Sequence, residues 1–232
     1  MGLKRERQRK GRRESQNRPV LSETWLFVSE GSKTEPKYIE SLVAYANGKT
    51  SVSKLKPKFV GTGRNTTGVV KVVDDLLAEI DMYKIKGEIH YAKIFVLFDL
   101  DSFEEGKFNT AVKMCEAKKR GYIPIWSNEC FELWYLLHYD FLDGDIGRKQ
   151  YYTILSEKLG VKYKENKSMD VFTHIQDKIS TGLKNAEKLR QRAKEAGTTP
   201  AESVPCTQMP RLVRELESLL KIKFEDFCDE RA

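Results

Sequence analysis

Three carboxylates follow apolar stretches of this sequence. An apolar run over residues 25–28 is followed within two residues by Glu30, and Gly31 comes next. A second apolar run, IFVLF, leads directly into Asp99 and Asp101. Residues two apart on a strand point to the same side, so the two aspartates can face one crevice. If the two runs form neighbouring strands, all three carboxylates converge at one place.

Three ionised carboxylates at one place need a counter-charge, because otherwise one of them must take a proton. Oxygen ligands without histidine favour Mg²⁺ (or Mn²⁺), which keeps several waters and leaves positions for phosphate oxygens. Gly31 lets the backbone turn sharply and a substrate approach closely. Ser32, Lys33 and Thr34 offer donors near the start of the next predicted helix, which is a natural anion site.

A DxD pattern alone is a weak indication of chemistry, and the chain contains its own comparison. Asp143 and Asp145 form a second DxD in FLDGDIG, but no buried strand precedes them and the sequence predicts a turn. Asp99 and Asp101 differ because IFVLF stands before them. In the structural alternative, Glu30 and Asp99 merely cap loops and helices.

These residues need elements that bring them to one edge. Apolar patterns predict strands that alternate with helices, and this alternation indicates an α/β fold with a parallel sheet flanked by helices. In such a sheet, ligands bind beyond the carboxyl ends of the strands. The predicted strands are 25–29, 58–60, 94–98 and 122–126, and the predicted helices are 35–45, 69–83, 106–120 and 131–139.

From about residue 148 the chain becomes helical and highly charged, without a further strand signal. Helices are predicted over 150–159, 170–196 and 208–220. This part either adds a surface for substrate or a partner, or its lysines only form a solvated face. The lysines in question are Lys158, Lys162, Lys164, Lys167, Lys178 and Lys184.

Positive charge is concentrated at the beginning of the chain. The formal net charge of the 232 residues is +7, and the first 20 residues, with eight basic and two acidic side chains, carry +6 of it. This segment lacks apolar periodicity, so we expect it to be disordered in isolation and either to contact nucleic-acid phosphates or to serve as a solubilising tail. The chain thus divides into a basic arm (1–22), an α/β core (23–147) and a helical extension packed on the core (148–232).

Cysteine spacing and hydropathy restrict the class of protein. The four cysteines lie far apart, with no CxxC and no secretory leader, so neither a zinc site nor a disulfide framework is favoured. No apolar run approaches the roughly 18 residues that span a membrane. We therefore expect a cytoplasmic protein with reduced cysteines.

A glutamate–glycine pair after the first strand and a DxD after a later strand resemble the TOPRIM fold of topoisomerases, primases and related nucleases. One branch is more similar, the RloB-like (AbiLii-like) proteins, through VSEGSKTEPKYI (28–39), VLFDLDSF (96–103) and SNECFELWYLLHY (127–139), and more weakly through PCTQMPRLVREL (205–216). The third block makes the resemblance specific, because TOPRIM proteins at large do not share it. Glu129 stands where the family usually carries proline, and we expect little consequence because Glu also suits a helix's first turn.

The resemblance implies roles for the acidic residues. Glu30 is similar to the TOPRIM glutamate, a general acid/base or metal ligand, and Asp99 and Asp101 are similar to the metal-binding pair. Glu132 is interpreted as a further metal ligand or as a buried carboxylate that accepts bonds from backbone N–H groups. Glu35 is interpreted as a participant in the chemistry or as a charge that complements the dipole at a helix N-terminus.

The other polar residues near these motifs receive simpler interpretations. Gly31, Ser32, Lys33 and Arg64 are candidates for substrate phosphate contacts, although Lys33 and Arg64 also fit ordinary exposed loop charges. His138 is interpreted as a packing residue.

The resemblance and the carboxylates together predict a Mg²⁺-dependent nuclease that cleaves DNA or RNA, including tRNA. RloB-like proteins are encoded beside an ATPase in phage-defence loci, so the resemblance implies an abortive-infection effector controlled by a partner ATPase of the ABC or AAA type. The alternative is a non-catalytic subunit that binds nucleic acid or a nucleotide and regulates that ATPase. Primase-like polymerisation is a third interpretation, for which no template or nucleotide-selecting motif is visible.

Overall fold

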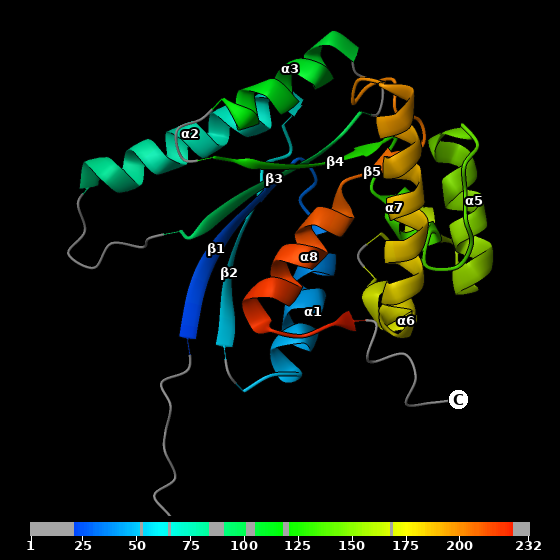
Figure 1. Ribbon diagram of the computed structural model, residues 1–232, viewed down its shortest axis with the longest axis horizontal. Coiled ribbons are helices and arrows are strands. Elements are labelled where there is room, and N and C mark those ends of the chain that lie inside the picture. Colours follow the sequence, from blue (N-terminus) through cyan, green and yellow to red (C-terminus); the bar gives the residue numbers. More distant parts are fainter. Residues whose placement is uncertain are drawn as a thin grey trace, which may run out of the picture.

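A five-stranded sheet with helices on both faces forms the centre of the protein in a computed structural model (Figure 1). The strands lie in the order β2-β1-β3-β4-β5. The first four are parallel, whereas β5 pairs antiparallel with β4. Their bounds are β1 Leu21–Ser29, β2 Ser53–Gly61, β3 Lys93–Asp99, β4 Ile123–Asn128 and β5 Cys206–Thr207. The structure describes residues 21–51, 53–64, 66–83, 91–100, 105–117, 121–167 and 169–224.

Helices connect and cover the strands. The helices that precede β4 in the sequence are α1 Thr34–Gly48, α2 Thr66–Tyr83 and α3 Glu105–Glu116. Those that follow β4 are α4 Glu132–Leu136, α5 Gly147–Leu159, η1 Tyr163–Glu165, α6 Phe172–Ile175, η2 Gln176–Lys178, α7 Ile179–Ala196 and α8 Met209–Leu220. This arrangement confirms the predicted α/β class, with a mostly parallel Rossmann-like sheet and a helical carboxyl-terminal part. Among the described helices, none is both long and apolar enough to cross a membrane.

The central strands bury side chains on both faces. Trp25 and Phe27 pack with α1 and the helices after β4, whereas Leu26 and Val28 pack with α2 and α3. Successive side chains of a strand point to opposite faces, so an uninterrupted apolar run such as IFVLF is typical of a strand covered on both sides. Figure 1 shows α2 and α3 on one side of the sheet and α1 and α8 on the other.

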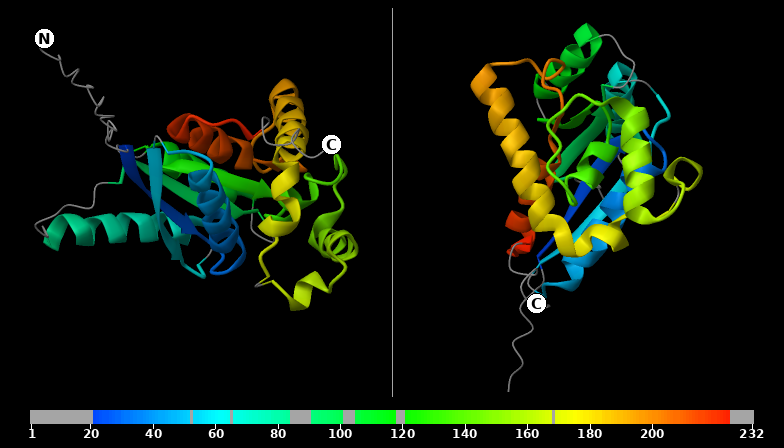
Figure 2. Two further views of the ribbon diagram at one scale, coloured as in Figure 1. Left: turned by 90° about the horizontal axis from the view of Figure 1, so that it is seen from below. Right: turned by 90° about the vertical axis from the view of Figure 1, so that its right-hand side faces the viewer.

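The strand order reverses next to β1. The chain leaves β1 through α1 to reach β2 on one side, and it returns through α2 to β3 on the other side. Because α1 and α2 cover opposite faces, a crevice is expected between the carboxyl ends of β1 and β3, where open α/β sheets bind ligands. Figure 2 shows α5, α6 and α7 grouped at the end of the sheet opposite the start of β1.

The carboxyl-terminal part contains a strand that the sequence did not predict. β5 is only two residues long, too short to produce a hydrophobic period, and it forms because Thr207 pairs with Ser127 of β4. The two buried hydroxyl oxygens lie 3.0 Å apart, within hydrogen-bond distance. The prediction of no strand after residue 148 was therefore wrong.

Three predicted boundaries also differ. The first predicted strand, 25–29, is β1, which begins at Leu21, and residues 1–20 lie outside the described part of the chain. β2 covers Ser53–Gly61 rather than 58–60, because lysines that alternate along this edge strand hide its pattern. The predicted helix over 131–139 is α4, which ends at Leu136 and continues as turns.

Gly182 of α7 offers a test of how tightly the carboxyl-terminal helices pack on α4. A Cβ atom there would lie 2.7–2.9 Å from three ring atoms of His138, which is buried. Alanine in a helix interior is favoured over glycine by about 1 kcal/mol, but overpacking costs about 1–3 kcal/mol. We expect Gly182→Ala to lower the free energy of unfolding by about 1 kcal/mol, as measured by urea denaturation.

The control for this experiment is Gly106→Ala in α3. A Cβ atom at Gly106 meets nothing within 4 Å, so this variant keeps or gains stability. Equal stability of the two variants would contradict the packing described for His138.

Candidate functional site

The motifs that carry Glu30 and Asp99 meet at the carboxyl ends of two neighbouring strands, β1 and β3. β1 and β3 are parallel neighbours, with Ser29 in register with Leu97. The Glu30 N–H donates to the Leu97 carbonyl oxygen at 2.9 Å, so the residue after β1 is fixed beside the end of β3, where Asp99 lies. The condition stated for convergence, that the two strands are neighbours, is confirmed.

The loop after β1 folds back on the start of α1. The Ser29 hydroxyl donates to the Gly31 carbonyl oxygen at 2.6 Å, and the Gly31 N–H donates to Glu35 Oε1 at 3.2 Å. A Cβ atom on Gly31 would lie 2.7 Å from Glu35 Oε1, well inside van der Waals contact. The φ angle of Gly31 is outside the left-handed region. Glycine is therefore needed here for space, and the group that comes close is the carboxylate of Glu35.

Glu35 lies in the first turn of α1 and is buried. Burial raises the pKa of its carboxyl group, and the charge of Glu132 raises it further, whereas backbone N–H groups and Arg148 act in the opposite direction. The position agrees with a helix N-terminal charge, but the electrostatic coupling to Glu132 also makes Glu35 part of the acidic site.

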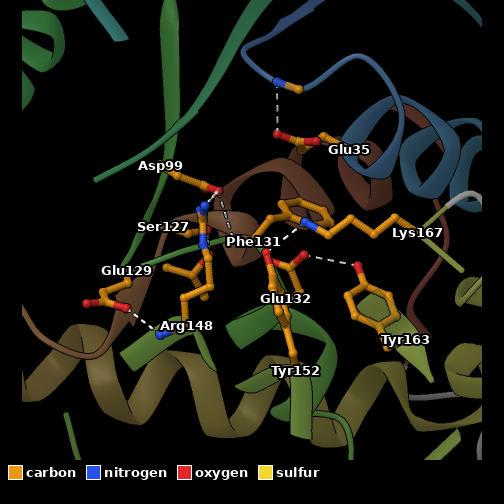
Figure 3. Close-up of polar contacts among 12 residues, drawn as sticks. Glu35, Asp99, Ser127, Glu129, Phe131, Glu132, Arg148, Tyr152, Tyr163 and Lys167 are labelled. Carbon is orange, nitrogen blue, oxygen red and sulfur yellow. Dashed lines mark hydrogen bonds and ion pairs between the residues drawn. The ribbon is translucent and has the colours of Figure 1, made fainter. Parts of the chain in front are cut away.

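Asp99 ends β3 and points toward the start of α4 (Figure 3). Its Oδ2 accepts a hydrogen bond from the Phe131 N–H at 3.1 Å and lies 3.5 Å from Nη2 of Arg148. Burial raises its pKa well above the ordinary range, and the charges of Glu35 and Glu132 raise it further. Arg148 and the Phe131 N–H only partly offset this rise.

Glu132, the first residue of α4, supplies a third carboxylate and is buried like Glu35. The Tyr163 hydroxyl of η1 donates to Glu132 Oε1 at 3.0 Å. The predicted alternatives for Glu132 were a metal ligand or a carboxylate bonded by backbone N–H groups, and the hydrogen bond found here comes from a side chain. Glu35, Asp99 and Glu132, called the carboxylate cluster below, come from three different elements.

Arg148 reaches the carboxylate cluster from α5, and its sequence neighbourhood gave no sign of this role. It is the second residue of α5, and its N–H donates to Glu129 Oε2 at 2.6 Å while its guanidinium lies against Asp99. Glu129 precedes α4 by three residues, so the expectation that it belongs to that helix's first turn was wrong. Its carboxylate instead holds the backbone from which Arg148 extends. The only available signal was a basic residue at the predicted boundary of the extension.

The predicted phosphate contacts Ser32, Lys33 and Arg64 are exposed in the loops after β1 and β2. A hydrogen bond joins the two loops, because the Gly63 N–H donates to the Glu30 carbonyl oxygen at 3.0 Å. These loops follow β1 and β2 at the same edge as the cluster, which is compatible with contacts to phosphate.

Asp101 lies outside the described residues, so its place is not part of this geometry. His138 is buried, and its Nδ1 is 2.8 Å from the Trp134 carbonyl oxygen. Burial lowers its pKa to about 4, in agreement with the interpretation of His138 as a packing residue.

The described residues contain no group of three His, Cys, Asp or Glu side chains arranged to hold a metal ion. The predicted ligand set includes Asp101, which is not among them. The donors of the cluster are carboxylate oxygens, the kind that hard cations prefer, but Glu35, Asp99 and Glu132 do not by themselves form a metal site. Perturbed carboxyl groups at the switch point of an α/β sheet are typical of functional sites.

Comparison with known proteins identifies a family. The family model described as RloB-like protein matches residues 25–216, a range that includes most of β1, the carboxylate cluster, Arg148 and most of α8. Neither a curated protein nor a solved structure shows significant similarity to the chain.

The contact between Gly31 and Glu35 gives a prediction about stability. Gly31→Ala forces the buried Glu35 carboxylate to move from the Gly31 N–H, and we expect a loss of about 1–2 kcal/mol in the free energy of unfolding. In a Glu35→Ala background the added methyl group has space, so we expect the same substitution to cost less than about 0.5 kcal/mol. A cost of this size is within the error to which the effects of independent substitutions add. A double-mutant cycle by chemical denaturation measures the difference, and equal costs in both backgrounds would refute this explanation of Gly31.

The raised pKa of Asp99 gives a prediction about pH. The unfolded chain releases this proton near the ordinary aspartate pKa of about 3.9, whereas the folded protein releases it at higher pH, so folding loses stability as pH rises through that interval. In chelator, we expect Asp99→Asn to lose less stability than wild type between about pH 4 and 7. At pH 7 it should be as stable as wild type or more so.

Urea denaturation at several pH values measures the difference between the two proteins. Asp143→Asn is the matched control, because the exposed Asp143 carboxylate accepts a hydrogen bond from Arg192, which lowers its pKa. A loss of about 1 kcal/mol in Asp99→Asn at pH 7, the usual cost of losing a cap, would show that Asp99 is structural.

Proposed function

The chain belongs to the RloB-like family, and from this membership and its carboxylate cluster we propose that it is a metal-dependent nuclease. The observation that carries the proposal is the meeting of Glu35, Asp99 and Glu132 beside Arg148 at the switch point of the sheet. Burying like charges together costs stability, and a ligand that supplies positive charge or takes up protons offsets that cost.

Asp99 and Glu132 would hold the ion in this proposal, together with Glu30 and Asp101. When bound, Mg²⁺ or Mn²⁺ polarises a phosphoryl oxygen and lowers the pKa of an attacking water. The oxygen-only donor set suits these hard cations and gives no reason to expect zinc.

The chain's own side chains would carry out the other tasks of phosphodiester cleavage. Glu30 follows β1 directly and is proposed to accept the proton of the attacking water. The guanidinium of Arg148 offers a planar set of donors for a non-bridging phosphate oxygen. Ser32, Lys33 and Arg64, in the adjoining exposed loops, are proposed to contact neighbouring phosphates.

The biological setting is proposed from the family resemblance. DNA or RNA, including tRNA, is the substrate class, and the nuclease would act as an abortive-infection effector controlled by an ATPase of the ABC or AAA type. The proposed location is the cytoplasm, where such substrates and such a partner occur.

A second candidate function has its own support in the structure. Asp99 is already engaged by Arg148 and by the Phe131 N–H, so the cluster has hydrogen-bonding partners without a metal ion. A site of this kind can bind a phosphate-bearing ligand without cleaving it. The protein would then be a regulatory subunit of the ATPase that binds nucleic acid or a nucleotide.

Cleavage assays with purified protein separate the two candidates. The protein is incubated with DNA and with total RNA in Mg²⁺, Mn²⁺ or chelator, with and without the ATPase encoded beside it. We expect cation-dependent cleavage, and Asp99→Asn should reduce its rate by at least about 100-fold. Asp143→Asn changes the other DxD, whose first carboxylate pairs with Arg192 away from the cluster, and should cleave like wild type.

Two results would overturn the nuclease proposal. One is cleavage that persists in chelator or in the Asp99→Asn variant. The other is tight, cation-independent binding of nucleic acid or nucleotide without cleavage under any of these conditions, which would favour the regulatory subunit.

A further inference from the structure

A hollow beside the carboxylate cluster lies between α5 and η1. It has a volume of about 1010 Å³, and its lining includes Glu129, Arg148, Lys149, Tyr152, Lys162 and Lys164. We call it the α5–η1 groove. Arg148 links this groove to the cluster, because it lines the groove and its guanidinium lies 3.5 Å from Asp99.

The charges along the groove suit an anionic chain. Lys149 and Lys164 are exposed, and Arg148 is partly exposed. The carboxylate of Glu129 accepts a hydrogen bond from the Arg148 N–H, and Glu165 lies 3.5 Å from Lys162 in an exposed pair. An exposed pair of this kind contributes little and is readily exchanged, so Lys162 can also contact a phosphate.

Other lysines of the carboxyl-terminal part are engaged elsewhere. Lys158 pairs with Asp140 at 2.6 Å, and Lys178 lies over the ring of Tyr139. Lys167 donates to the Tyr152 hydroxyl at 2.7 Å and so fixes a side chain of the groove. The six lysines considered as a substrate surface or a solvated face therefore separate: Lys162 and Lys164 line the groove, Lys158, Lys167 and Lys178 contact other side chains, and Lys184 is exposed on α7.

A second basic hollow, on α7 and α8, provides a comparison. It has a volume of about 530 Å³ and is lined by Lys184, Glu187, Lys188, Gln191, Arg192 and Arg214. Its two arginines pair with Asp143 at 2.6 Å and with Glu217 at 2.8 Å, and neither of these acids belongs to the carboxylate cluster. A chain bound there would not be guided to Asp99.

We propose that the α5–η1 groove binds the sugar–phosphate backbone of a single-stranded segment of nucleic acid and leads it past Arg148 to Asp99. A concave groove lined by exposed lysines can follow the phosphates of one flexible strand, and we expect it to accept a stiff duplex less readily. The inference rests on the proposed function in that it names the substrate of the same site, a strand with unpaired nucleotides.

Binding without cleavage tests the groove. In chelator, fluorescence anisotropy of a labelled single strand of about 12 nucleotides is measured from about 50 to 300 mM salt. We expect Lys149→Ala with Lys164→Ala to weaken binding roughly tenfold or more at the lowest salt. The slope of affinity against salt should fall by about 0.7 for each phosphate that the variant no longer neutralises. A blunt-ended duplex of two fully complementary strands should compete poorly.

The matched control is Lys184→Ala with Lys188→Ala. It removes the same charge from exposed positions of the second hollow and should bind the strand like wild type. Thermal melts of both double variants check that each remains folded. The proposal is overturned if the groove variant binds like wild type, if the control weakens binding equally, or if the duplex competes as well as the strand.

The outcome is separate from that of the cleavage assay. Loss of strand binding in the groove variant, with no cleavage by wild type, would keep the groove and remove the nuclease. Cation-dependent cleavage with unchanged strand binding in the groove variant would keep the nuclease and remove the groove.

Discussion

Repulsion among three neighbouring carboxylates, two buried and one partly buried, is the constraint on which the rest of this structure depends. Glu35 and Glu132 are buried, the side chain of Asp99 is 15% exposed, and the charges of the two glutamates oppose ionisation of Asp99. A buried charge is tolerated only with hydrogen-bond donors and compensating charge. Donors come from the Gly31 N–H, the Phe131 N–H and the Tyr163 hydroxyl, and positive charge comes from Arg148.

These donors belong to segments that are far apart in the sequence. Tyr163 is 31 residues from Glu132, and Arg148 is 49 residues from Asp99. The helical part after residue 147 is therefore required at the cluster as well as in the core, where Tyr151 and Leu155 of α5 pack in the same apolar cluster as Trp25 of β1. Charge compensation and apolar packing together fix α5 beside the carboxyl end of β3.

The sequence predicted the features of this site that depend on local pattern. IFVLF identifies a strand buried on both faces, and a residue directly after such a strand must lie at its carboxyl end, so Asp99 and Glu30 were placed correctly beside neighbouring strands. Gly31 was recognised as a place of close approach, but the group that approaches is Glu35 of the same chain rather than a substrate. A sequence pattern shows that space is needed, and it does not show what fills the space.

Features that depend on distant contacts had no such signal. Arg148 and Tyr163 are ordinary surface residue types in a charged helical stretch, and only the packing of α5 and η1 turns them toward Glu132 and Asp99. β5 escaped prediction because two residues cannot show a period, although pairing with β4 closes the sheet beside Ser127, the register partner of Asp99. Local pattern identified Asp99 and the family resemblance pointed to Glu35 and Glu132, whereas the groups that make their burial tolerable come from the tertiary fold.

The cost of this arrangement is itself an argument about function. Replacing buried charged groups by apolar side chains of similar volume is often neutral or stabilising, so stability alone gives a fold little reason to keep three carboxylates together. Structural ion pairs usually balance their charges, but here three acids face two cations, Arg148 and Lys167, and the pKa values of Asp99 and Glu35 are raised even so. An imbalance at the switch point of an α/β sheet is what a site needs if its missing positive charge is to arrive with a ligand.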